Sequence, residues 1–501
     1  MHLTVDATAQ VVFARVMRRG IAFTAAVFLA VMPLPASAGV VPCSFDAGSA
    51  TATVIPQAGS AVLSVVSGDQ IWVDGQPCGA ADTSNTDTIA VAAALADDIE
   101  IDLGGGPFAP GLTDEGDGTS EIEFQIDGGP AFLTITGSNG ADHLTAGTRS
   151  PTLAWAGEIA TFNLNAAGID DDADVLMLHD SLFSASVALG GGRDAMFAGT
   201  PGTDQDTAFL GTLLVEGGAG ADTIQPGFGD GGYWGDAPTS VLDPRRDTLT
   251  IAWVAVECQA IVENFPLGET NLDCTDSDAT FDTSYFEKIV GHDGPDSVFG
   301  AGWREVIRVR GGDDAVAPGL GSGLIEGGQG WDLLIVGETD PVRVDLTARR
   351  ILGEGPKDFS GVEGVFSVDE GKDVFTGEPS GVIDIVSGGD GRNVVDLRTA
   401  TRGFTVHTVA ATSFGPFGPG LWVHAADVLG TPFDDRMTGE TGAYPDGHDV
   451  FRGLGGDDHL DGGAGPDTLL GGTGDDVIVG GDGLDTCSGG PGFDVVSSCE
   501  P

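Results

Sequence analysis

The end of the chain repeats one nine-residue pattern without a gap. From Gly453 to Ser497 the blocks read GLGGDDHLD, GGAGPDTLL, GGTGDDVIV, GGDGLDTCS and GGPGFDVVS, and the block before them, YPDGHDVFR, keeps the register. Position eight of each block is apolar, and position six is an aspartate: Asp449, Asp458, Asp467, Asp476, Asp485 and Asp494. A fixed register this long favours a stack of similar coils over a globular domain, because each coil presents the same residue types at the same places.

The chemistry of the block predicts a loop followed by a strand. The first six residues are turn-formers, and glycine is needed where the backbone reaches positive φ and packs closely against the next coil. The last three residues form a short strand, whose alternation turns position eight into the stack. Backbone carbonyls and one aspartate carboxylate then converge in each loop. Such hard oxygen ligands suit Ca²⁺.

The blocks resemble the GGxGxDxUx nonapeptide of RTX (haemolysin-type) calcium-binding proteins, which build a parallel β-roll. The resemblance implies that successive blocks lie on opposite edges and that calcium sits between neighbouring loops of one edge. It places Asp458, Asp476 and Asp494 on one edge and Asp449, Asp467 and Asp485 on the other. The loop glycines expected beside the metal are Gly463, Gly465, Gly472, Gly474, Gly481 and Gly483. The alternative is a set of solvated acidic loops without metal, which fits a single loop better than a six-fold register.

A second array occupies residues 291–335. Its blocks read GHDGPDSVF, GAGWREVIR, VRGGDDAVA, PGLGSGLIE and GGQGWDLLI, and position six alternates between aspartate and other residues. The aspartates are Asp296, Asp314 and Asp332, whereas Glu305 and Gly323 occupy the blocks between them. A two-edged roll with this pattern keeps good metal sites on one edge only.

Residues 1–38 are predicted to be a secretion signal. Arginines precede an apolar run that ends at Pro33, and Ala36-Ser37-Ala38 supplies a cleavage site. The run is too short to span a membrane, so no transmembrane segment is expected in the mature chain. The start codon is either Met1 or Met17. General secretion to the exterior or the cell surface is favoured over the one-step export of many RTX proteins.

Charge and cysteines agree with an extracellular protein. The chain has 76 acidic and 21 basic residues, for a net charge of −55, which argues against nucleic acid or anionic membranes as partners. This charge serves either general solubility or cation binding, and the recurring aspartates favour the second. Six cysteines in an exported chain predict disulfides. Fifteen pairings are open, and proximity favours Cys43–Cys78, Cys258–Cys274 and Cys487–Cys499.

The predicted fold is all-β, an elongated parallel β-roll or β-helix solenoid with irregular inserted loops. Residues 39–136 form an irregular β region, either solenoid coils or a small β-sandwich. The rest divides into a degenerate solenoid with insertions (137–290), the second array (291–335), degenerate coils (336–443), the RTX-type roll (444–497) and a tail (498–501).

The motifs favour binding over catalysis. The sequence has no HExxH, G-x-S-x-G or P-loop motif, and no catalytic or organic-cofactor residue is predicted. The leading hypothesis is a secreted, non-catalytic protein that binds several calcium ions and serves as a structural or adhesive element. Its expected partners are calcium and glycans or proteins of the cell surface or matrix. The alternative is a β-solenoid polysaccharide lyase or hydrolase whose RTX coils form a calcium-stabilised stalk.

Overall fold

The computed structural model of the chain consists of short β-strands, and the described residues contain no helix. They span 43–500 with gaps at 57–58, 67, 95–96, 107, 109–111, 113–121, 128–131, 140–141, 150–157, 164–174, 180–183, 199–211, 227–230, 236–246, 252–258, 264–267, 274–277, 285, 301–303, 320, 338–340, 353–355, 369–371, 380–384, 388–391, 409–420, 425–426 and 440–447. The predicted signal at 1–38 and the Cys258–Cys274 pair lie outside the described residues. No described helix is long and apolar enough to cross a membrane.

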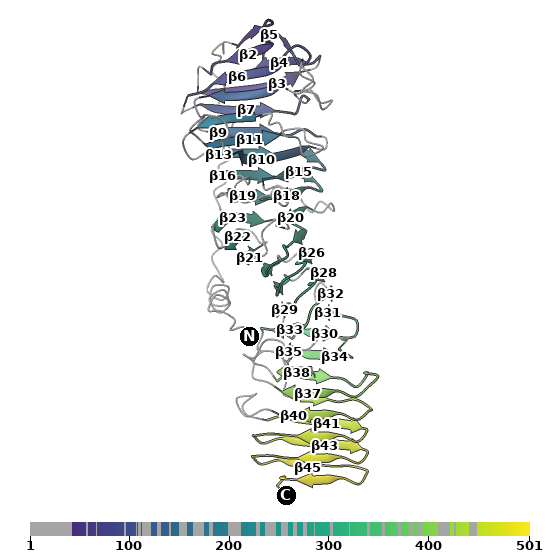
Figure 1. The fold of residues 1–501 in the computed structure, drawn as a ribbon. Coiled ribbons are helices and arrows are strands. Elements are labelled where there is room, and N and C mark those ends of the chain that lie inside the picture. The colour runs from purple at the N-terminus through teal and green to yellow at the C-terminus, as the bar shows by residue number, and fades with distance from the viewer. Residues whose placement is uncertain are drawn as a thin grey trace. The chain divides into compact units, whose positions relative to one another are not determined.

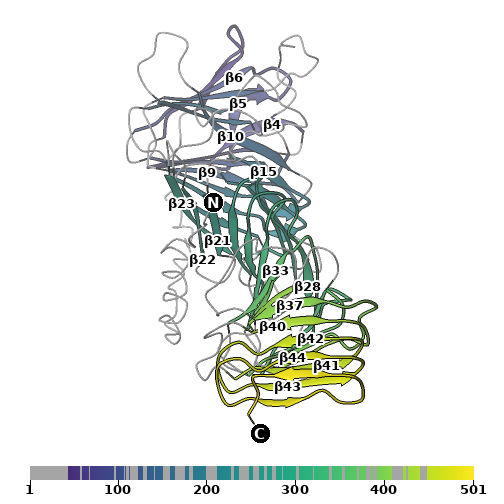
Figure 2. The ribbon, with the colours of Figure 1, turned by 60° about the horizontal axis from the view of Figure 1, so that its bottom comes forward.

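The chain divides into two compact units, Gly39–Val362 and Glu363–Pro501, here called the N-terminal and C-terminal units. Each unit is built on two sheets, whose strands lie in successive layers in Figures 1 and 2.

The first sheet of the N-terminal unit contains β1 (Cys43–Asp46), β2 (Thr51–Val54), β6 (Thr88–Ala92), β8 (Glu123–Asp127), β10 (His143–Arg149), β11 (Glu158–Asn163), β12 (Val175–His179), β15 (Ala195–Phe197), β18 (Thr223–Gln225), β20 (Thr248–Thr250), β24 (Lys288–Val290), β26 (Glu305–Arg308), β28 (Gly323–Glu326), β30 (Arg343–Asp345), β31 (Arg350–Leu352) and β32 (Lys357–Ser360).

Its second sheet contains β3 (Ser60–Val66), β4 (Gln70–Val73), β5 (Gln76–Asp82), β7 (Asp98–Asp102), β9 (Phe132–Thr136), β13 (Ser184–Ala188), β16 (Thr212–Glu216), β19 (Gly231–Trp234), β21 (Gln259–Glu263), β22 (Gly268–Asp273), β23 (Asp278–Ser284), β25 (Asp296–Phe299), β27 (Ala315–Ala317) and β29 (Leu333–Val336). The short strands β14 (Gly191–Gly192) and β17 (Ala219–Gly220) pair with each other.

Parallel pairing makes the start of the N-terminal unit a set of solenoid coils. Strands β2, β6 and β8 pair in parallel in one sheet, and β3, β7 and β9 do so in the other. Apolar residues alternate with polar ones, as in the DIEID sequence of β7, where Ile99 and Ile101 are buried. Among the described residues of 39–136, these parallel pairs agree with the expectation of solenoid coils, and the antiparallel pairs β1–β2, β3–β4 and β4–β5 lie beside them.

Antiparallel strands mark the places where extra chain enters the coils. The groups β10–β11–β12, β21–β22–β23 and β30–β31–β32 are antiparallel, yet their outer strands also join parallel neighbours. An insertion therefore lengthens one coil, and the parallel stack resumes after it.

The C-terminal unit has the regular two-edged arrangement. One sheet contains β34 (Val374–Thr376), β36 (Val394–Asp396), β39 (Asp427–Leu429), β41 (Val450–Gly455), β43 (Thr468–Thr473) and β45 (Thr486–Ser488). The other contains β33 (Gly364–Ser367), β35 (Ile385–Ser387), β37 (Thr405–Thr408), β38 (Leu421–His424), β40 (Arg436–Thr438), β42 (His459–Asp461), β44 (Val477–Val479) and β46 (Val495–Ser497). From β39 onward consecutive strands alternate between the sheets and every pairing is parallel.

The core of this roll is one apolar residue thick on each side. Phe451, Leu469 and Cys487 are in register in one sheet, and Leu460 and Ile478 are in register in the other. The four large apolar residues are fully buried, and each burial contributes about 1.5–3 kcal/mol. Because each block adds only one such side chain, the core alone leaves the roll weakly stabilised against its conformational entropy.

Two of the three favoured disulfides are confirmed. Cys43 bonds to Cys78, with their Cα atoms 5.2 Å apart, and Cys487 bonds to Cys499, with their Cα atoms 6.0 Å apart.

Candidate metal centre

The position-six aspartates form a hydrogen-bonded column on one edge of the C-terminal roll. Each lies at the turn from a loop into a strand, and its Oδ1 accepts a hydrogen bond from the backbone N–H of the aspartate one coil earlier. The Asp458 N–H donates to Asp476 over 2.9 Å, and the Asp476 N–H donates to Asp494 over 3.1 Å. The structure thus brings together the three residues that the sequence assigned to this edge.

The opposite edge carries a second column of the same kind. The Asp449 N–H donates to Asp467 Oδ1 over 2.9 Å, and the Asp467 N–H donates to Asp485 Oδ1 over 2.8 Å. The partners are two blocks apart, so the expected coil of two nonapeptides is the observed one.

The second carboxylate oxygen marks the candidate metal position. Oδ2 is buried and has no hydrogen-bond partner in Asp458, Asp467, Asp476 and Asp485, counting partners among the described residues. A buried ionised oxygen without a partner is costly, and a bound cation removes that cost.

Burial raises the pKa of these carboxyl groups in the metal-free protein. The pKa of Asp458 rises to about 7 and that of Asp467 to about 6, with desolvation as the main cause and neighbouring aspartate charges as a smaller one. The pKa of Asp476 is raised for the same reasons. Without a counter-ion the charged form is disfavoured, whereas a divalent cation stabilises it.

The loop glycines supply a second set of oxygens. All six predicted glycines have positive φ, from 84° at Gly463 to 155° at Gly483. A Cβ added to Gly472 would collide with the Leu454 carbonyl oxygen, and one added to Gly474 would collide with that of Gly456. Carbonyls at positions two and four therefore face the next loop. A gap lined by carbonyl and carboxylate oxygens fits Ca²⁺, which takes six to eight oxygen ligands.

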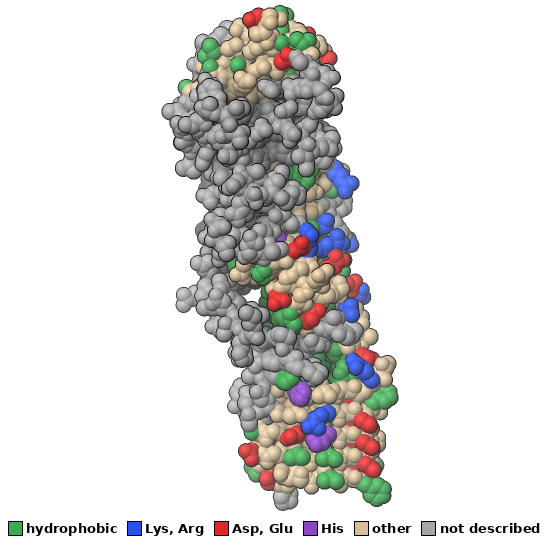
Figure 3. Space-filling view, in the orientation of Figure 1, with side chains coloured by type: hydrophobic (Ala, Val, Ile, Leu, Met, Phe, Trp, Pro, Cys, Tyr) green, Lys and Arg blue, Asp and Glu red, His purple; other side chains and the backbone are tan. Residues whose placement is uncertain are grey.

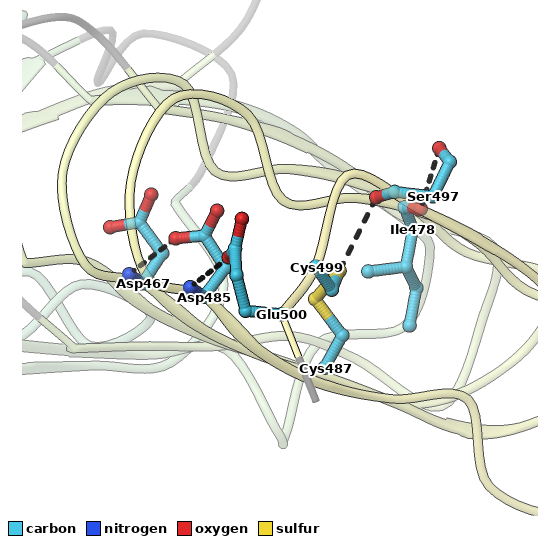
Figure 4. Close-up of a disulfide and its surroundings, with 7 residues drawn as sticks. All are labelled: Asp467, Ile478, Asp485, Cys487, Ser497, Cys499 and Glu500. Atoms are coloured by element: carbon cyan, nitrogen blue, oxygen red, sulfur yellow. Dashed lines mark hydrogen bonds between the residues drawn. A yellow bond between two sulfur atoms is a disulfide. The ribbon is translucent and has the colours of Figure 1, made fainter.

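Glu500 ends one column and was not predicted from the sequence. Its Oε2 accepts the Asp485 N–H over 2.9 Å, where the next coil would supply an aspartate. Figure 4 shows Asp467, Asp485 and Glu500 in line, beside the Cys487–Cys499 bond that holds the tail. Glu500 stands outside the nonapeptide register, so the repeat pattern gave no signal for it.

Asp435 extends the other column upstream. Its Oδ1 accepts the Phe404 N–H over 2.7 Å, and its own N–H donates to Asp458 Oδ1 over 2.8 Å. The Thr431 N–H occupies Asp435 Oδ2 over 2.6 Å, so this end lacks the open oxygen of later coils. The surrounding segment GTPFDDRMTG matches only part of the nonapeptide, and its longer spacing to the next block hid its register in the sequence.

The second array builds one column of the same design. The Asp296 N–H donates to Asp314 Oδ1 over 2.8 Å, and the Asp314 N–H donates to Asp332 Oδ1 over 3.1 Å. Burial raises the pKa of Asp314 to about 8, and its Oδ2 has no partner among the described residues. His292 lies at the upstream end of this column, where its ring Nδ1 is 2.6 Å from Asp296 Oδ1.

A further column lies upstream. Asp142 donates its N–H to Asp194, Asp194 to Asp222, Asp222 to Asp247 and Asp247 to Glu287, each over 2.9 Å. Inserted segments make the spacing irregular, so only isolated nonapeptide blocks are recognisable in this part of the sequence.

Side chains alone do not complete a metal site. Within the part of the chain that the structure describes, no three His, Cys, Asp or Glu side chains form a metal-binding group. The candidate sites instead depend on backbone carbonyls, which is typical of calcium.

Comparison with known families agrees with this geometry. Residues 446–469 and 461–496 match the RTX calcium-binding nonapeptide repeat, in four copies. The C-terminal roll is therefore built from RTX calcium-binding repeats. No curated protein matches the chain.

Proposed function

We propose that this protein is a secreted, non-catalytic element of the cell surface or matrix whose C-terminal roll is held together by calcium. The observation that carries the proposal is the pair of aspartate columns, in which buried Oδ2 atoms without hydrogen-bond partners among the described residues alternate with loop carbonyls. These oxygens fit the coordination of calcium, and the ion compensates the negative charge of the buried carboxylates.

Each proposed calcium site lies between two loops that are neighbours on one edge. The C-terminal roll then has four sites, between Asp458 and Asp476, Asp476 and Asp494, Asp449 and Asp467, and Asp467 and Asp485. The Asp449 site is the weakest, because its block lacks the leading glycines. In the second array Asp296, Asp314 and Asp332 provide two more.

Extracellular residence is supported by the two disulfides and by the strongly negative net charge. The predicted signal at residues 1–38 supplies the export route.

The adhesive role is supported by one surface of the C-terminal unit, here called the aromatic face. The rings of His407 and Trp422 stack with centroids 4.4 Å apart, and Arg436 lies in register with His459 on the neighbouring strands. Figure 3 shows histidine and basic side chains grouped on this unit, beside a column of acidic ones. Stacked aromatic rings with a basic side chain nearby fit the apolar face and the hydroxyl groups of a sugar ring.

Calorimetric calcium titration of the full chain tests the metal part of the proposal. Saturable binding of several ions supports it, and no binding at millimolar calcium refutes it. Asp69→Asn is the control for loss of an aspartate outside the columns and should bind as many calcium ions as the unchanged chain. Asp69 lies in an exposed turn of the N-terminal unit, and asparagine tolerates its φ of 63°.

Glycan binding tests the adhesive part and the enzymatic alternative together. Retention of a polysaccharide that is lost in Trp422→Ala, with no change in polymer length, supports adhesion. Shortening of the polymer with time would favour the lyase or hydrolase.

A further inference from the structure

Lys357 is a buried lysine on the edge of the second array that lacks aspartates. Its side chain is 4% exposed, and lysine is almost never so buried unless its charge has partners. It begins β32, directly after the segment that carries the antiparallel strands β30 and β31.

The strand register places Lys357 where a position-six residue belongs. Glu305 is paired with Gly323 in β26 and β28, and Gly323 is paired with Lys357 in β28 and β32. This is the edge opposite Asp296, Asp314 and Asp332. The order along it is carboxylate, no side chain, ammonium.

The carboxylate ladder stops at Gly323. In the complete columns a position-six N–H donates to the next carboxylate, but the Glu305 N–H donates to the Ser322 carbonyl over 3.1 Å. Glu305 itself is buried, with 2% exposure. A buried carboxylate needs a cation. Upstream, the strand register aligns Glu305 with Glu287, but the gap between Glu305 and Gly323 has no second carboxylate to help bind a divalent ion.

Lys357 reaches the oxygen that a metal would use. Its Nζ donates a hydrogen bond to the Gly319 carbonyl. Gly319 is position two of its block, which corresponds to Leu454 in the C-terminal roll, whose carbonyl faces the next loop. A Cβ added to Gly300 would collide with Glu305 Oε2 and would lie 2.9 Å from the Gly319 nitrogen. The Glu305 carboxylate and the Gly319 loop therefore border the same gap.

We propose that the Lys357 ammonium replaces calcium on this edge of the second array. The inference rests on the proposed function, in which the aspartate columns bind calcium. An ammonium offers three donors and one positive charge, which suits a gap with one carboxylate and backbone carbonyls. A complete column has two carboxylates per gap and suits a divalent ion. Lys357 thus keeps the gap beside Gly323 free of metal, and it enters this edge at the end of the insertion that carries β30 and β31.

The test compares variants of the full chain in chelator and in calcium. Lys357→Met keeps most of the side-chain volume and removes the charge, and Lys372→Met removes an exposed ammonium as the matched control. In chelator we expect Lys357→Met to unfold roughly 10 °C below the control, because it leaves Glu305 buried without its cation. In calcium we expect the difference to shrink and equilibrium dialysis to show about one additional ion per chain.

Glu305→Gln supplies the rescue. If the ammonium neutralises this carboxylate, Glu305→Gln combined with Lys357→Met is more stable in chelator than Lys357→Met alone, and it binds no additional ion. Equal destabilisation in chelator and calcium, without rescue, would mean that Lys357 only packs, and the proposal would be wrong. If Lys357→Met fails to fold, folding of the double variant supports the proposal and failure of both overturns it.

These results separate the inference from the proposed function. The control variant reports whether the chain binds calcium at all, which tests the function. If it binds none, the rescue by Glu305→Gln in chelator still decides whether Lys357 supplies the charge for Glu305.

Discussion

At the scale of single residues, the position-six aspartates use the two oxygens of their carboxylates for two different interactions. In aspartates inside the columns, such as Asp467 and Asp476, Oδ1 accepts a backbone N–H from the previous coil and Oδ2 is left for a cation. The first interaction was not visible in the sequence, but it explains why asparagine can replace aspartate once: the Asp373 N–H donates to Asn393 Oδ1 over 2.9 Å. Asparagine preserves the ladder but removes the charge, so we expect no calcium site at Asn393.

Asp476 and Asp494 offer a direct test of stacking. Asp476 lies between two coils, so its loss affects two proposed sites, whereas Asp494 belongs to the last coil and to one site. We expect Asp476→Ala to lower both calcium stoichiometry and melting temperature about twice as much as Asp494→Ala, measured by titration and calorimetry. Equal losses from the two variants would contradict sites shared between neighbouring loops.

The raised pKa values predict how the metal-free protein responds to pH. An aspartate whose pKa is higher in the folded state stabilises the fold below its unfolded pKa of about 3.9 and loses that contribution as pH rises. With Asp467 at about 6, Asp458 at about 7 and Asp314 at about 8, stability in chelator should fall between about pH 4 and pH 8. Urea titrations across this range measure it. Saturating calcium should remove the fall, because the ion stabilises the charged form; a fall that persists in calcium would contradict the assignment.

At the scale of the element, the sequence predicted regular coils well and interrupted coils poorly. The blocks after Gly453 fixed strands, register and edges, because loop and strand chemistry recur without insertion. Asp194, Asp222 and Asp247 form an equivalent column that was not predicted, since their spacing depends on inserted segments. Lys357 was missed for the same reason. The residues of a column are neighbours in three dimensions, and only an uninterrupted repeat makes that neighbourhood recognisable in the sequence.

The stabilisation that the C-terminal tail contributes can be measured. Cys487 and Cys499 are 12 residues apart, and their bond holds Glu500 against Asp485. We expect Cys487→Ala combined with Cys499→Ala to destabilise the C-terminal unit by about 2–3 kcal/mol in denaturant titrations. Glu500→Gln should cost less and should leave the disulfide intact. Replacing Cys43 and Cys78 is the control, because that bond lies in the N-terminal unit; an equal effect on the C-terminal unit would argue against a local end cap.

At the scale of the whole molecule, charge opposes folding until cations bind. Beside the buried columns runs an exposed one, in which the Asp457 N–H donates to Asp434 and the Asp475 N–H to Asp457, each over 2.8 Å. With a net charge of −55, folding gathers carboxylates that the unfolded chain keeps apart. The two units differ in how they meet this cost, because the N-terminal unit has irregular coils and Lys357 on one edge, whereas the C-terminal roll stacks aspartates on both edges.

We therefore expect calcium to control the folding of the C-terminal unit far more than that of the N-terminal unit. At a concentration 100-fold above the dissociation constant, each site that exists only in the folded state adds about 2.7 kcal/mol, so four sites decide the stability of a roll with a thin core. Calorimetry of the full chain should show the transition of residues 363–501 in calcium and its loss in chelator, with β structure followed by circular dichroism. Magnesium should not replace calcium, because it requires a tighter octahedral shell. Half-molar sodium chloride separates the two electrostatic explanations, since it screens repulsion without filling the loops. If salt alone restored the transition, repulsion would be the whole barrier and the loops would not be metal sites; if only calcium restores it, the aspartate columns bind the ion that their open oxygens require.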